Sequence, residues 1–81
     1  MSRAKAIAKV NDEIIECFNR IEANQMNPSR KDLLFLTDQY NEISTSYYTH
    51  RQINVCGDCR TYIFKFWKNV IIEWRKVNIS K

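Results

Sequence analysis

Apolar residues recur at steps of three and four along three stretches of the chain, a spacing that places side chains on one face of an α-helix. The first stretch predicts a helix near residues 3–24, with Ser2 as a candidate N-cap. Its apolar stripe consists of Ile7, Val10, Ile14, Cys17 and Ile21. Helix is disfavoured at a residue that precedes proline, so the Asn-Pro pair at 27–28 predicts an end near Asn24.

A second helix is predicted near residues 29–48. Ser29 can cap it, with Asp32 in the position that Glu usually takes in a capping box. Phe35 lies on the polar side of this helix. The serines, threonine and aromatic residues that begin at Ser44 predict that its end frays near Tyr48. The apolar stripe consists of Leu33, Leu36, Tyr40, Ile43 and Tyr47.

The longest periodic stretch predicts a third helix near residues 56–78, after a loop that carries the only histidine, His50. Asn54 is a candidate N-cap. Asp58 stands in the first turn, where the helix dipole favours negative charge. One face of this helix carries Cys56, Cys59, Ile63, Phe66, Trp67, Val70, Trp74 and Val77.

Three helices joined by two short connections predict an all-α fold, with a three-helix antiparallel arrangement in a single small domain of residues 1–81. One glycine and one proline are too few for the frequent turns of an all-β protein. The sequence lacks a signal-peptide pattern and a run of about 20 apolar residues, so no membrane association is expected. We therefore expect a cytoplasmic protein with reduced thiols.

Large apolar residues also occupy the borders and the polar side of the third helix. A helix that is apolar on two sides is normally buried on two sides. In a chain of 81 residues, the second covering surface is expected to come from another protein or from a second copy. The predicted partner-binding residues on the second and third helices are Phe35, Phe64, Trp67, Ile71 and Ile72.

Cys56 and Cys59 form a Cys-x-x-Cys motif with three interpretations. In the first, both cysteines and Cys17 are small apolar residues on buried stripes, and the protein needs no cofactor. In the second, these thiols and His50 complete a Cys3His zinc site that stabilises a small module. In the third, the pair is a redox centre. That interpretation is disfavoured, because such centres usually follow a strand and none is predicted here.

The net charge of +4 is compatible with an anionic partner. Nucleic-acid binding is therefore an alternative function, and a solvated helix face is the competing explanation for the same basic residues. The residues concerned are Arg60, Lys65, Lys68, Arg75 and Lys76. Because the sequence shows no glycine-rich phosphate loop and no Ser-His-Asp order, we expect neither an enzyme nor a small-molecule substrate.

The second half of the chain contains LTDQYNEI at residues 36–43, then CGDCR at 56–60 and FKFWKNV at 64–70. This pattern resembles small helical proteins encoded by tailed phages. The resemblance implies an accessory or virion-associated phage protein, in the host cytoplasm or the virion, and it carries over no catalytic residue. The resulting expectation is a non-enzymatic interaction or structural protein that binds through aromatic faces of its second and third helices.

Overall fold

The computed structural model describes residues 3–79, which form five α-helices and no strand, so the predicted all-α class is confirmed for this part of the chain. Ser2, the candidate N-cap, lies outside the described residues. The helices are α1 (Arg3–Lys9), α2 (Asp12–Ala23), α3 (Arg30–Ile43), α4 (His50–Val55) and α5 (Gly57–Ile79).

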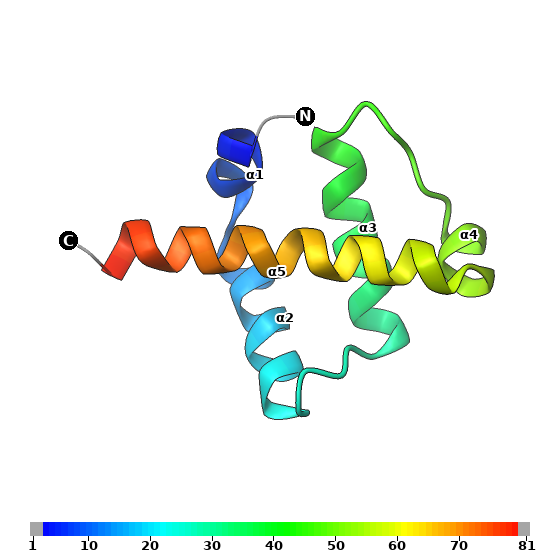
Figure 1. Ribbon diagram of the computed structural model, residues 1–81, viewed down its shortest axis with the longest axis horizontal. Coiled ribbons are helices and arrows are strands. Elements are labelled where there is room, and N and C mark those ends of the chain that lie inside the picture. Colours follow the sequence, from blue (N-terminus) through cyan, green and yellow to red (C-terminus); the bar gives the residue numbers. More distant parts are fainter. Residues whose placement is uncertain (1–2, 80–81) are drawn as a thin grey trace.

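The long helix α5 runs crosswise over α1, α2 and α3, and α4 lies at its N-terminal end (Figure 1). The molecule is flat, with principal extents of 41 × 30 × 18 Å. The arrangement therefore differs from the predicted antiparallel one of three helices, because α5 covers its neighbours at a steep angle.

The first predicted helix, near 3–24, is broken in two at Asn11. The Asn11 backbone is extended, and its side chain accepts a hydrogen bond from the backbone N–H of Ile14 at 3.0 Å. Asn11 is thus the N-cap of α2 and begins a new helix. The apolar spacing continues across the break, so periodicity alone did not reveal it. The predicted end near Asn24 is confirmed, since Asn24 is the C-cap of α2.

The second predicted helix begins as expected, because the Ser29 side chain accepts from the backbone N–H of Asp32 at 3.1 Å. It ends at Ile43 and does not reach residue 48. Downstream, the Asn41 side chain donates to the Tyr48 carbonyl at 2.8 Å and accepts from the Tyr48 N–H at 3.0 Å. These two bonds fold the segment after α3 back onto the helix. Tyr47, predicted on the apolar stripe, is 71% exposed.

The loop predicted to carry His50 contains the short helix α4. Thr49 and Gln52 form a capping box, in which each side chain hydrogen-bonds the backbone N–H of the other residue. Ile53 is the buried residue of this helix. The sequence signal was therefore present in Thr49-x-x-Gln52, followed by an apolar residue.

The core lies between α5 and the other helices, and Trp67 is at its centre. The indole of Trp67 is fully buried, and its Nε1 donates to the Leu36 carbonyl at 2.9 Å. This bond fixes α5 on α3. The other buried apolar residues are Ala6, Ile14, Cys17, Phe18, Ile21, Leu33, Leu36, Tyr40, Ile53, Ile63, Val70 and Ile71.

Candidate functional site

Helix α5 has two faces, one that packs on the core and one that does not. Ile63, Trp67, Val70 and Ile71 are buried against the other helices. The opposite face, here called the outer face of α5, is formed by residues that are all exposed at helical spacing. These residues are Tyr62, Lys65, Lys68, Asn69, Ile72 and Lys76.

The burial of Trp67 and Ile71 contradicts their prediction as partner-binding residues. Trp67 also lies on the predicted apolar stripe, and its burial agrees with that position. Ile71 lies at the border of the stripe, and the steep crossing of α5 lets the core use more of the helix circumference than one stripe. Phe64 is half-buried and stacks on Phe18, with ring centroids 6.1 Å apart. Phe35 is half-buried against the core. Ile72 alone among the five is exposed, at 41%.

The C-terminal end of α5 extends past α1 and α2 (Figure 1). A helix of 23 residues is about 35 Å long, whereas α2 and α3 have 12 and 14 residues. The core-facing stripe therefore runs beyond the core. Val70 is fully buried, Trp74 is half-buried outside the core cluster, and Val77 is 53% exposed. The sequence pattern placed Trp74 and Val77 on the core-facing stripe because it predicted three helices of similar length. The break at Asn11 and the end of α3 at Ile43 shorten the first two helices and leave this part of α5 uncovered.

An ion pair holds this extending end to the body of the molecule. Both terminal guanidinium nitrogens of Arg75 donate to the Glu22 carboxylate in the last turn of α2, Nη1 at 3.1 Å. Hydrogen bonding to Arg75 lowers the pKa of Glu22, and the same bond raises the pKa of Arg75. This exposed ion pair links the end of α5 to α2.

Two of the five predicted nucleic-acid contacts have structural roles within the chain. Arg75 pairs with Glu22, and Arg60 donates to the carbonyls of Ile53 and Asn54 at 2.8 and 3.1 Å. The other three residues, Lys65, Lys68 and Lys76, are exposed on the outer face of α5.

The residues of the alternative zinc site do not converge. Cys17 is buried, and His50 Nε2 lies 2.7 Å from the Asp38 carboxylate. Within residues 3–79, no group of three or more His, Cys, Asp or Glu side chains could hold a metal ion. Burial raises the pKa of Cys17 to about 12, and nearby Asp32 adds to this shift.

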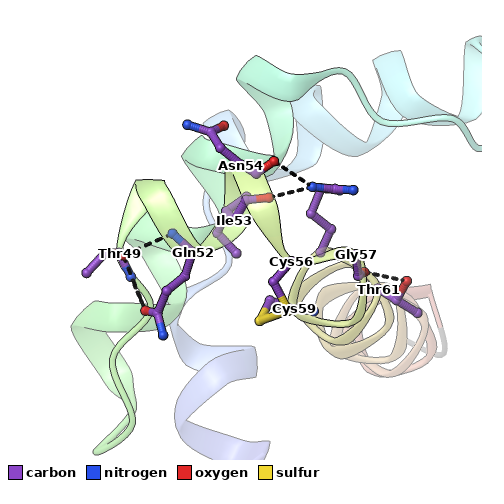
Figure 2. The surroundings of a disulfide bond; sticks show 9 residues. Thr49, Gln52, Ile53, Asn54, Cys56, Gly57, Cys59 and Thr61 are labelled. Carbon is purple, nitrogen blue, oxygen red and sulfur yellow. Dashed lines mark hydrogen bonds between the residues drawn. A yellow bond between two sulfur atoms is a disulfide. The ribbon is translucent and has the colours of Figure 1, made fainter.

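Cys56 and Cys59 are joined in a disulfide, so the prediction of reduced thiols is wrong for this pair (Figure 2). Their Cα atoms are 5.3 Å apart at the junction of α4 and α5. Cys56 is the C-cap of α4, and its Sγ accepts from the backbone N–H of Cys59 at 3.1 Å. The motif thus begins the long helix, as its spacing predicted.

A small surface pocket lies between α2 and α3 and has a volume of about 230 Å³. Arg20 and Asp32 pair across it at 3.2 Å. Burial opposes ionisation of Asp32, but hydrogen bonds from Arg20 and Ser29 outweigh it and lower the pKa. This pair joins the two helices and supplies no reactive group. The pocket is lined by Glu13, Glu16, Arg20, Lys31, Asp32 and Phe35.

Comparison with known proteins gives no match to a family model, a curated protein sequence or a solved structure. None of the helices in residues 3–79 is long and apolar enough to cross a membrane. A functional proposal for this chain therefore depends on the exposed residues and reactive groups described above.

Proposed function

We propose that this chain is a non-enzymatic interaction protein that binds another protein through the C-terminal end of α5. The proposed docking end consists of Trp74 and Val77 on the apolar stripe of α5, with Lys76 at the edge of that stripe. The observation that carries the proposal is that the apolar stripe of α5 continues past the core to Val77, which is 53% exposed. An amphipathic helix whose apolar side lacks cover typically lies in a groove of a partner.

The composition of the docking end fits such a role. Trp is a common anchor of protein interfaces, where a few buried side chains supply most of the binding free energy. Covering one Val or Ile side chain contributes about 1.5–3 kcal/mol when burial is complete. Lys76 lies beside Val77 in the sequence and is exposed, which favours a groove whose rim is acidic. The resemblance to phage proteins suggests an accessory or virion component as the setting.

Site-specific photo-crosslinking tests this proposal with a matched pair of valines. A photoreactive amino acid replaces Val77 in one variant and Val55 in the other. Val55 is 77% exposed at the end of α4, away from the docking end, so it reports contacts that do not involve the docking end. In cells that express the protein, position 77 is expected to give one discrete cross-linked product that position 55 does not give. A product of twice the chain mass would identify a second copy as the partner.

Equal product patterns from the two positions, or no product from position 77, would refute the docking end. The loss of that product in Trp74→Ala, at unchanged helix content, would support a Trp anchor. Retention of the product in this variant would show that the contact does not depend on Trp74.

Nucleic-acid binding remains the second candidate, because Lys65, Lys68 and Lys76 are all exposed along one face of α5. Phosphate contacts release counterions, so such binding weakens steeply with salt. The expected result is binding to a random DNA duplex at about 50 mM salt that is about 40-fold weaker at about 200 mM, as three phosphate contacts predict, and that is lost in K65E/K68E/K76E. If binding is insensitive to these substitutions, the outer face of α5 is not the nucleic-acid surface.

A further inference from the structure

We propose that Cys56 and Cys59 form a redox-active pair that exchanges thiols and disulfides with another dithiol or disulfide. This site lies at the N-terminal end of α5, whereas the docking end is at its C-terminus (Figure 1). The two proposals therefore rest on different residues and can fail independently.

Hydrogen bonding favours a thiolate at Cys56. Its Sγ already accepts from the Cys59 backbone N–H at 3.1 Å, and it stands at the start of a 23-residue helix. The N-terminus of a helix carries partial positive charge, which stabilises an anion placed there. A thiolate is the reactive form of cysteine in disulfide exchange. Cys56 is thus the sulfur suited to attack a disulfide of a partner.

The two sulfurs also differ in surroundings. Cys59 packs against the hydrophobic core, whereas Cys56 lies outside the cluster of core and packed residues. Val55, Gly57 and Asp58 are exposed beside them. A side chain added at Gly57 would meet only the Arg60 guanidinium, at 3.7 Å. Both cysteines are half-buried, and a partner can approach the pair from the open side at Gly57, where Cys56 lacks the core contacts that Cys59 makes.

The junction around the pair is held by contacts that do not involve the disulfide. Arg60 donates to the last carbonyls of α4, and the Thr49–Gln52 capping box fixes the start of α4 (Figure 2). The strand that usually precedes a redox Cys-x-x-Cys is replaced here by this short anchored helix. The framework can therefore keep both sulfurs within reach of each other after the bond is broken.

Cys17 provides an internal contrast. Its thiol is buried in the core and its pKa is raised to about 12, so it carries almost no thiolate at neutral pH. Thiol–disulfide exchange is therefore expected at Cys56 and Cys59 and not at Cys17.

The exchange balances without a further reagent. The Cys56 thiolate attacks one sulfur of a partner disulfide, which forms a mixed disulfide and releases one partner thiolate. The Cys59 thiol loses its proton to solvent, attacks Cys56 Sγ and expels the second partner thiolate, which takes up a proton. The partner disulfide gains two electrons, and the Cys56–Cys59 dithiol is oxidised to the disulfide that the structure contains. The reverse sequence oxidises a partner dithiol.

The wild-type chain tests the equilibrium without any substitution. The protein is equilibrated in glutathione buffers that range from fully reduced to fully oxidised, alkylated, and mapped by peptide mass spectrometry. The expected result is a reversible two-electron transition of Cys56 and Cys59, with the same end point from either direction, while Cys17 stays a free thiol. A pair that remains oxidised, or remains reduced, across all buffers would overturn the proposal.

Single-cysteine variants test which sulfur attacks. Cys59→Ser leaves Cys56 free, and Cys56→Ser leaves Cys59 free. With oxidised glutathione as probe, the mixed disulfide is expected to form at least tenfold faster on Cys56 than on Cys59. Helix content by circular dichroism checks that both variants fold. Equal rates, or a faster Cys59, would overturn the assignment of Cys56 as the nucleophile, and the wild-type titration still decides whether the pair is redox-active.

Discussion

The replacement Trp67→Phe tests whether Trp67 is the central anchor of the fold. The indole Nε1 donates to the Leu36 carbonyl at 2.9 Å in a fully buried position. Phenylalanine keeps most of the apolar surface but removes this donor and the second ring. The substitution therefore measures what the indole hydrogen bond and the volume of the second ring contribute to stability, because a large apolar side chain remains at this position.

The expected cost follows from two effects. Loss of a buried hydrogen bond costs about 1 kcal/mol. Removing one ring leaves a void of roughly 40 Å³, which costs about 1 kcal/mol at 24 cal/mol per Å³ before the lost transfer free energy is counted. The sum is about 2–3 kcal/mol in the free energy of unfolding. A domain of this length has a total stability of only about 4–12 kcal/mol, so the effect should be large.

Urea unfolding, followed by far-ultraviolet circular dichroism, measures this cost. Trp74→Phe is the matched control, since Trp74 lies on the same helix outside the core cluster. It is expected to change the free energy of unfolding by less than about 0.5 kcal/mol, as substitutions at the surface usually do. If both variants lose the same stability, or if Trp67→Phe is neutral, the burial argument for α5 is wrong.

Three further predictions follow from local contacts. Asn11→Ala removes the N-cap of α2 and should cost about 1 kcal/mol in urea unfolding. Asp32 and Glu22 have lowered pKa values in the folded state, so the unfolded chain binds more protons in acid. The stability that these two carboxylates contribute is therefore fully present above their pKa values in the unfolded chain, and it is lost as the pH falls through their pKa values in the folded chain. Asp32→Asn should make the melting temperature depend less on pH, which thermal melts at a series of pH values measure. Reduction of the Cys56–Cys59 disulfide should cost at most about 2 kcal/mol, because the closed loop is very short. Melts with and without a reductant measure that difference.

Local chemistry predicted several boundaries correctly. The Ser29 cap and the end of α2 at Asn24 follow from short-range preferences that the structure retains. The all-α class follows from apolar spacing and from the scarcity of glycine and proline. The helical start of the Cys-x-x-Cys segment was likewise readable, because Cys56 and Cys59 lie on the stripe of α5.

The predictions that failed depended on three-dimensional arrangement. Apolar spacing stays in phase across Asn11, so a break set by one side-chain hydrogen bond is invisible to periodicity. The burial of Ile71, at the border of the apolar stripe, depends on the angle at which α5 crosses its neighbours, and no local pattern encodes this angle. Val77 is exposed for the opposite reason, since the helices beneath it are too short to reach it.

The shortness of α1 has a consequence for how the molecule opens. A seven-residue helix is not stable alone in water, so α1 persists only through its packing on α3 and α5 and through the ion pair between Lys9 and Glu42. Fluctuations of the native state should therefore detach this segment first, long before the whole chain unfolds. Amide protons of Ala6 and Ile7 would then exchange with deuterium far sooner than those around Trp67. Each such event would briefly widen the uncovered surface of the long helix.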